Sequence, residues 1–306
     1  MNIRTLLPKA PKIASTTKAQ SPLRVTAIGS CRVLGPLRRN ASSGFSLNQA
    51  GIYGYCHSSA EALQQIRVLQ HELTLPQRLR PVVAPSITGG DISAAGHSAS
   101  DLYFVELCSA KVLTVEGVSV QLNYLTRHFS EFFADRDRAR SFWRLARQPD
   151  SSALLAFLAD DPAYLGLDAS DQAILGSTRL ELATAESLTQ DLSEIAARIK
   201  DVVFVTHFDA AKHDGSLLHA RAEYLQMVRA VLDDLGLDYF DPSEDVRRFG
   251  QATALEDASA SLSHYAPGFE ERLGRKWEAR YIAPRQTSVP PPSPERVEAL
   301  QVAQPV

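Results

Sequence analysis

Apolar positions in the last third of the chain recur with helical spacing and then gather in short runs. One apolar stripe predicts a helix over 180–199, and its members are four, three and four residues apart: Leu188, Leu192, Ile195 and Ile199. An apolar run over 202–206, a second helical pattern over 217–235 and a short apolar run over 237–240 follow it. Helices that alternate with buried strands are typical of parallel sheets joined by crossover connections.

Two apolar runs earlier in the chain predict further strands. The first covers Val25 to Ile28 and stops at Gly29, and the second covers residues 102–107. Together with the later pattern, these runs predict a three-layer α/β domain with a mainly parallel sheet. Weaker patterns predict, in chain order, a helix over 59–72, a short strand over 81–84, a hairpin over 112–122 and a last helix over 268–281.

The remaining segments predict the domain organisation. Residues 125–178 have a helical, aromatic-rich pattern and are expected to form a helical insertion. Residues 1–22 are expected to be a flexible leader, because their prolines interrupt any long helix. Residues 285–306 are rich in proline and are expected to be a disordered tail. One α/β domain would then cover 23–284.

Composition excludes several classes of protein. The net charge of -3 is too small to favour a nucleic-acid partner, and no apolar run reaches the length of a membrane span. The three cysteines form no CxxC pair, so we expect no metal site, no disulfide framework and a cytoplasmic location. No GxGxxG follows a strand, and we expect no cofactor. No acidic residue precedes Glu61, so a targeting role for the basic N-terminus stays open.

Polar side chains follow the predicted strands where ligands bind in α/β sheets. Because the carboxyl ends of parallel strands share one edge of the sheet, these side chains are expected to converge. In chain order they are Ser30, Cys31, Arg32, Ser109, His207 and Asp241. Two further histidines are candidates: His57 ahead of a helix N-terminus, which favours anions, and His264 at the start of the last helix.

The hydroxyl and thiol after the first strand indicate nucleophilic catalysis. Ser30 would need a base to remove its proton, and His264 is the candidate, with a third group to orient the imidazole. Cys31 is the alternative nucleophile, because a helix N-terminus and the neighbouring Arg32 would both lower the pKa of its thiol. Arg32 is also a candidate ligand for an anionic part of a substrate. His207 is a candidate substrate ligand or alternative base.

Two short motifs resemble the SGNH/GDSL-type hydrolases, in particular their GSCFA-like branch. These are Gly29-Ser30-Cys31 after the first strand and the late His264 in Leu262-Ser263-His264-Tyr265. The resemblance implies a flavodoxin-like α/β/α fold and serine ester hydrolysis or acyl transfer, often on glycans. It also implies that Ser30 is the nucleophile and an oxyanion-hole donor, and that His264 is the base.

The sequence departs from that family at its other blocks. Ser261 stands where the family often has an aspartate three residues before the histidine. Asp257 is a substitute only if the chain turns between it and His264, and Asp241 would give the chain order Ser, Asp, His. The glycine and asparagine motifs that form the oxyanion hole in that family are not recognisable in this sequence. Gly54 and Ser109 are the candidates for them.

The leading hypothesis is an esterase or acyltransferase that acts on an O-acyl group of a glycan. Water would accept the acyl group in an esterase, and a sugar hydroxyl would accept it from a donor such as acyl-CoA in a transferase. Two alternatives stay open. One is an acyltransferase that depends on Cys31, and the other is a non-catalytic protein that binds a sugar or nucleotide in glycan assembly.

Overall fold

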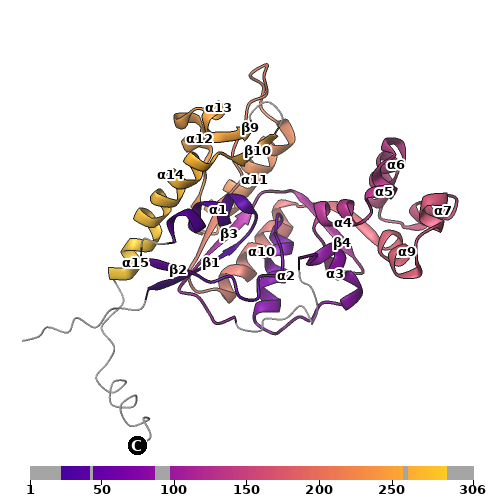
Figure 1. The fold of residues 1–306 in the computed structure, drawn as a ribbon, viewed down its shortest axis with the longest axis horizontal. Coiled ribbons are helices and arrows are strands. Elements are labelled where there is room, and N and C mark those ends of the chain that lie inside the picture. The colour runs from indigo at the N-terminus through magenta and orange to yellow at the C-terminus, as the bar shows by residue number, and fades with distance from the viewer. Residues whose placement is uncertain (1–21, 42–43, 87–96, 258–260, 288–306) are drawn as a thin grey trace, which may run out of the picture.

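The computed structural model of the protein describes residues 22–41, 44–86, 97–257 and 261–287 (Figure 1). The leader expected over 1–22 lies outside these residues, Pro22 apart, as does the expected tail from residue 288 onward. Residues 285–287, which were expected to belong to that tail, are instead the end of helix α15 (Ala283–Thr287). None of the helices in the described ranges combines the length and the apolar composition needed to cross a bilayer.

A five-stranded sheet forms the centre of the fold (Figure 1). Its strand order is β2-β1-β3-β7-β8. All four pairs of neighbouring strands are parallel. The strands are β1 (Leu23–Ile28), β2 (Phe45–Leu47), β3 (Leu102–Leu107), β7 (Val202–Thr206) and β8 (Tyr239–Phe240). Counted within this sheet alone, the order is 2-1-3-4-5, which is that of flavodoxin-like folds. The predicted mainly parallel α/β architecture is therefore confirmed.

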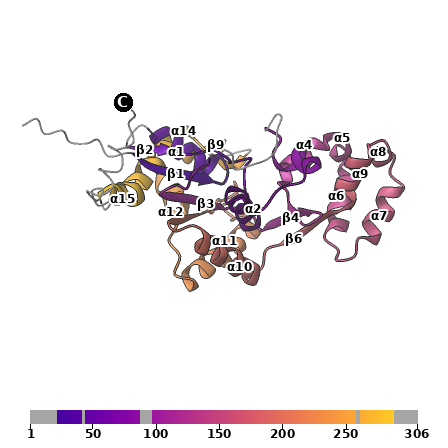
Figure 2. The same cartoon turned by 90° about the horizontal axis from the view of Figure 1, so that it is seen from below.

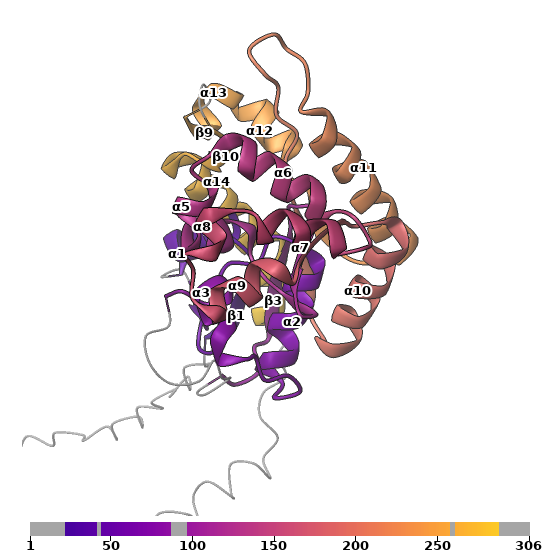
Figure 3. The ribbon, with the colours of Figure 1, turned by 90° about the vertical axis from the view of Figure 1, so that its right-hand side faces the viewer.

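Helices cover both faces of the sheet (Figure 3). Alternate side chains of β3 divide between the two layers. Leu102 and Phe104 pack in the core that also holds residues of α1 (Cys31–Asn40) and α14 (Pro267–Trp277). Tyr103 and Val105 pack in the opposite core. The helices of that second layer are α2 (Ser59–Leu69), α10 (Ala185–Arg198) and α11 (His219–Asp234).

Between β3 and α10 the chain leaves the central sheet and forms a second sheet with a group of helices at one end of the molecule (Figure 2). The antiparallel strands are β4 (Lys111–Val115), β5 (Val118–Ser119) and β6 (Thr178–Leu182). The helices are α4 (Leu122–His128), α5 (Ser130–Phe133), α6 (Arg136–Ala146), α7 (Ser152–Ala159), α8 (Pro162–Leu165) and α9 (Ala169–Gly176). The helices expected over 125–178 are thus present.

The segment after β8 returns to the central sheet through a hairpin. The elements are α12 (Ser243–Phe249), α13 (Gln251–Ala254), β9 (Leu255–Asp257) and β10 (Ser261–Tyr265), followed by α14 and a π-helical turn η2 (Glu278–Ile282). His264, which was expected to open the last helix, lies instead on strand β10. Another local difference is at residues 80–83, which form a helical turn α3 (Arg80–Val83) after the 3₁₀ turn η1 (Gln77–Leu79), where a strand was expected.

Candidate active site

The turn after β1 carries the two candidate nucleophiles. Ser30 is the N-cap residue of α1, and its hydroxyl accepts the Arg32 backbone N–H at 3.3 Å. Only 3% of Ser30 is exposed. Gly29 is required here by packing, because a Cβ at this position would lie 2.5 Å from the Cβ of Glu106. The turn therefore places Cys31, the first helical residue, at the mouth of a cleft.

Cys31 is the candidate nucleophile that contacts the candidate base. Its Sγ lies 3.4 Å from Nδ1 of His264, across 233 residues of sequence. Ser30 instead uses its hydroxyl to cap α1 and donates its backbone N–H to Glu106 at 2.5 Å. The fold thus brings the thiol, and not the hydroxyl, to the imidazole.

Burial sets the resting state of this thiol. It raises the pKa of Cys31 above the ordinary thiol value, while the adjacent Arg32 guanidinium and a hydrogen bond with Ser30 lower it to a smaller extent. The thiol is therefore protonated at neutral pH. A nucleophile in this state needs a neighbouring base to accept its proton during attack.

Arg32 is not placed as an exposed ligand for an anionic substrate. Its side chain is only 8% exposed, and its Nε donates to Oε1 of Glu106 at 2.7 Å. Burial alone would raise the pKa of Glu106, but the Arg32 charge and the hydrogen bonds from Ser30 hold it below its usual value. The result is a charged, buried ion pair directly beneath the nucleophile turn.

The cleft in front of Cys31 and His264 has a volume of about 1150 Å³ and a cationic lining. It lies at the carboxyl edge of the sheet, where the Ser30 turn, Ser109 and His207 meet, as the strand pattern predicted. None of the described residues that line it is an aspartate or a glutamate. Besides Arg32, the lining cations are Lys111, Arg127, Arg147, Lys212 and Arg221.

Two histidines in the cleft are held in defined states. His207 is 4% exposed, and its Nδ1 lies 2.7 Å from the Phe208 backbone nitrogen and 3.2 Å from the Phe208 carbonyl oxygen. Burial, followed by the charge of Arg32, holds the pKa of His207 well below its usual value. Burial also lowers the pKa of His57, whose ring contacts the Gln121 amide at 3.2 Å. Both imidazoles are therefore neutral at pH 7.

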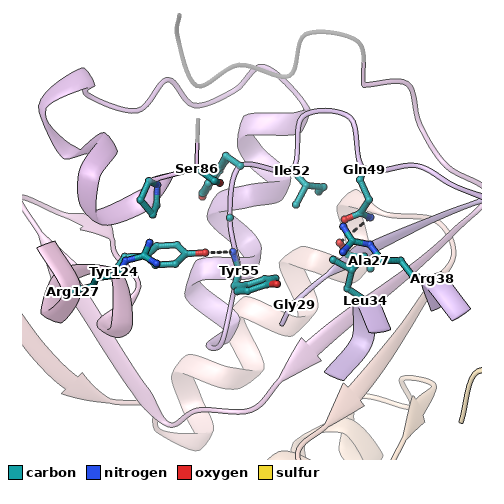
Figure 4. A pocket seen from close by; sticks show the side chains of 13 residues that line it. Ala27, Gly29, Leu34, Arg38, Gln49, Ile52, Tyr55, Ser86, Tyr124 and Arg127 are labelled. Carbon is teal, nitrogen blue, oxygen red and sulfur yellow. Dashed lines mark hydrogen bonds between the residues drawn. The ribbon is translucent and has the colours of Figure 1, made fainter. Parts of the chain in front are cut away.

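Gly54 shapes a second pocket beside the cleft (Figure 4). This pocket has a volume of about 370 Å³ and shares Tyr55, Tyr124 and Arg127 with the cleft. The Tyr124 hydroxyl accepts the Tyr55 backbone N–H at 3.0 Å. A Cβ at Gly54 would lie 2.9 Å from the Val83 carbonyl oxygen and 3.2 Å from the Tyr124 ring, so glycine keeps this wall closely packed.

The two aspartates considered as partners of His264 have different surroundings. Asp241 lies 2.6 Å from Nε of Arg229 and accepts the Ser243 backbone N–H, and it is not among the described residues that line the cleft. The β9–β10 hairpin supplies the chain reversal that Asp257 would need. The side chain of Asp257 lies outside the described part of the structure. Among the described groups of His, Cys, Asp and Glu, none of three or more members could hold a metal ion.

Glu106, Gln121 and most of the cleft cations were not predicted from the sequence. Glu106 could have been found, because it is a carboxylate inside the apolar run of β3 and buried carboxylates need a partner. Gln121, Arg127 and Arg147 come from the segment between β3 and α10, whereas Lys212 and Arg221 come from the loop after β7 and from helix α11. No local pattern shows that the first of these segments folds over the sheet edge.

Glu61 of helix α2 makes the region sensitive to pH. Burial raises its pKa to about 8, even though it accepts hydrogen bonds from the His57 N–H and the Ser58 hydroxyl. A carboxyl whose folded-state pKa is raised stabilises the fold below its unfolded-state pKa of about 4.3 and loses this contribution as pH rises through the folded value. We expect the unfolding free energy to fall between about pH 5 and pH 8, and the Glu61→Gln variant to lack this part of the decline.

Urea unfolding at several pH values would measure the difference between Glu61→Gln and the unmodified protein. Glu186→Gln is the matched control, because Glu186 occupies the first turn of α10 and is exposed. Identical pH profiles for the unmodified protein and the Glu61→Gln variant would contradict the expectation.

Comparison with known proteins identifies sequences that are similar to this chain. A family model described as the TviD N-terminal domain matches residues 23–280. The Vi polysaccharide biosynthesis protein TviD of Salmonella typhi is 35% identical over 260 residues, which is 84% of this chain and 31% of the relative. The chain thus spans about a third of that relative's length. A solved structure that is 13% identical in sequence matches 84% of this chain and 95% of its own chain, with a TM-score of 0.36.

Proposed function

The chain belongs to the family of TviD N-terminal domains, and on that premise we propose that it moves an acyl group to or from a polysaccharide hydroxyl, with Cys31 as nucleophile and His264 as base. The relative's name associates that protein with the biosynthesis of a polysaccharide. This association supports a glycan substrate for the present chain. Acyl chemistry is supported by the thiol and imidazole at the cleft mouth.

The 3.4 Å contact between Cys31 Sγ and His264 Nδ1 carries the proposal. His264 accepts the thiol proton while sulfur attacks the carbonyl carbon of the acyl donor. The tetrahedral intermediate expels the donor's alcohol or thiol, which takes the proton from His264, and a thioester forms on Cys31. A glycan hydroxyl or water then attacks the thioester, gives its proton to His264 and releases the acyl product. The proton returns to Cys31.

Donors for the developing oxyanion are available beside the sulfur. The Cys31 backbone N–H belongs to the first turn of α1, where N–H groups have no partner within the helix and the helix dipole favours negative charge. The hydroxyl-bearing Ser109 and the imidazole of His207 line the same cleft. These groups fit the requirement for fixed donors facing the reacting carbonyl.

The cleft chemistry favours an anionic stretch of glycan. Five cations besides Arg32 line the cleft, and no described lining residue offsets them with a carboxylate. The chain as a whole has a net charge of -3, so this positive lining is a local property. Arg127 and the Tyr55–Tyr124 wall continue it into the neighbouring pocket, where aromatic faces and hydroxyl groups suit a sugar residue (Figure 4).

Two features support the alternative of a glycan-binding domain without catalysis. The thiol is protonated at rest, and within the part of the chain whose side chains are described the His264 ring contacts Cys31 and no carboxylate. A triad normally contains a group that orients the imidazole. The catalytic and the binding hypotheses differ in whether an acyl group becomes covalently attached to the protein.

Acyl trapping tests the proposal. The protein is mixed with p-nitrophenyl acetate, quenched in acid and mapped by peptide mass spectrometry. We expect one acetyl group on Cys31, removed by neutral hydroxylamine as a thioester would be. An acetyl group on Ser30 would reassign the nucleophile to the preceding residue. No adduct, together with salt-sensitive binding of an anionic polysaccharide, would support binding without catalysis.

A further inference from the structure

We propose that Glu106 and Arg32 are positioning residues that hold Cys31 and His264 in contact. This inference rests on the proposed Cys31–His264 pair and goes beyond it, because neither positioning residue takes part in the acyl chemistry. Glu106 is fully buried, and the Arg32 side chain is 8% exposed. Both act through the chain segments that they hold.

One carboxylate oxygen of Glu106 fixes the nucleophile. Oε2 accepts the Ser30 backbone N–H at 2.5 Å, which anchors the residue directly before Cys31 to strand β3. The absence of a side chain at Gly29 allows this close approach, since a Cβ there would lie 2.9 Å from Oε2. The start of α1 is thereby tied to the centre of the sheet.

The other carboxylate oxygen fixes the base through Arg32. Oε1 accepts Nε of Arg32 at 2.7 Å, and Nη1 of the same guanidinium donates to the carbonyl oxygen of Ser263 at 2.9 Å. Ser263 directly precedes His264. One planar group therefore connects the carboxylate under the nucleophile to the strand that carries the base.

Strand β10 needs this support, because its pairing with β9 is irregular. The register pairs Ser261 with Asp257 and Tyr265 with Leu255, and it shifts in between, where His264 lies. Arg221 adds a second guanidinium contact through Nη1 to the Leu262 carbonyl oxygen at 2.7 Å. The two arginines thus hold successive carbonyl groups ahead of His264 that no regular ladder fixes.

The chemistry of the pair fits a positioning role better than a stabilising one. Two buried charges lose hydration, and a well-packed apolar pair of similar volume is often as stable or more stable. Apolar side chains could not hold two backbone segments in fixed directions. The guanidinium can, because its N–H groups point along a rigid fork, whereas the ammonium of lysine is a single point charge.

The test measures the alkylation of Cys31 by iodoacetamide, followed by peptide mass spectrometry across the pH range. This reaction needs the thiol and its neighbouring base but no acyl transfer. The variants are His264→Ala, Arg32→Lys, the two combined, and Arg32→Met with Glu106→Met. Arg138→Lys is the control, because Arg138 forms a partly buried ion pair with Asp161 in the helical segment away from the cleft. The paired methionine variant removes both charges together and avoids a buried unpaired charge.

We expect His264→Ala and Arg32→Lys each to slow the alkylation of Cys31 about tenfold at neutral pH, the change equivalent to one pKa unit of the thiol. Their combination should cause no further loss, because Arg32 acts through His264. The paired methionine variant should keep its melting temperature and lose the reactivity, and Arg138→Lys should keep both.

Two other outcomes separate the failure of this inference from that of the proposed function. Multiplied effects in the combined variant, about 100-fold, or undiminished reactivity in Arg32→Lys would overturn the positioning role while leaving the Cys31–His264 pair intact. The same holds if the paired methionine variant keeps its reactivity. Unchanged reactivity in His264→Ala would instead remove the pair itself, and with it both the proposed mechanism and the inference that rests on it.

Discussion

The Cys31→Ala variant is expected to lose acyl release from p-nitrophenyl acetate by about 10³-fold or more, because it removes the only group that the proposed mechanism bonds to the acyl carbon. Ser30→Ala should lose less than about tenfold. It removes the helix cap, which costs about 1 kcal/mol of stability, and keeps the backbone N–H bond to Glu106. The measurement is the release of p-nitrophenol under single-turnover conditions.

Cys31→Ser is the informative companion of these two variants. Its hydroxyl occupies the same place beside His264, and an oxygen ester would replace the thioester. We expect weak activity and an adduct that resists neutral hydroxylamine. Full activity in Cys31→Ala with loss in Ser30→Ala would contradict the mechanism. It would reassign the nucleophile to Ser30, the residue that the SGNH/GDSL resemblance implies.

The fold was predictable where periodic segments are long. The run over 202–206 corresponds to β7, and the helical pattern over 217–235 to α11 (His219–Asp234). Strand β6 (Thr178–Leu182) was missed, because the pattern analysis began a helix at Leu180. Its strand conformation comes from pairing with β4, more than sixty residues earlier in the chain. Such a long-range contact leaves no local signal.

Local turn chemistry explains another error. Residues 81–84 are apolar and include the β-branched Val82 and Val83, which predicts a strand. Pro81, however, lies in the first turn of α3, where its missing N–H costs nothing. The three residues of β2 (Phe45–Leu47) are too few to give a pattern within a segment rich in glycine, serine and asparagine. The conformations of α3 and β2 therefore depend on the segments that surround them.

The convergence of the site was predictable, but the identity of the contacting atoms was not. Strand ends at Ser30, Ser109 and His207 face one cleft because parallel strands share an edge. Whether Ser30 or Cys31 faces the imidazole depends on where α1 begins. A helix turns by about 100° per residue, so a shift of one position redirects the side chain. The structure starts the helix at Cys31 and uses Ser30 as its cap.

The second large effect is expected for His264→Ala, which should slow the acylation of Cys31 by about 10² to 10⁴-fold, the usual contribution of a positioned general base. The requirement is strong here because burial keeps the thiol protonated, so little thiolate exists without a base. Exogenous imidazole should restore part of the rate, since the small variant side chain leaves room beside the sulfur. Stopped-flow measurement of p-nitrophenol release would give both rates.

His219→Ala is the matched control for this prediction. His219 lines the same cleft, yet its side chain is 85% exposed and lies 3.2 Å from Glu223. Its loss should change the acylation rate less than about twofold, as for a surface substitution. Equal losses in both variants would show that the effect is not specific to His264. A loss confined to His264→Ala and relieved by imidazole would assign it to proton transfer at the sulfur, which the contact between Cys31 and His264 requires.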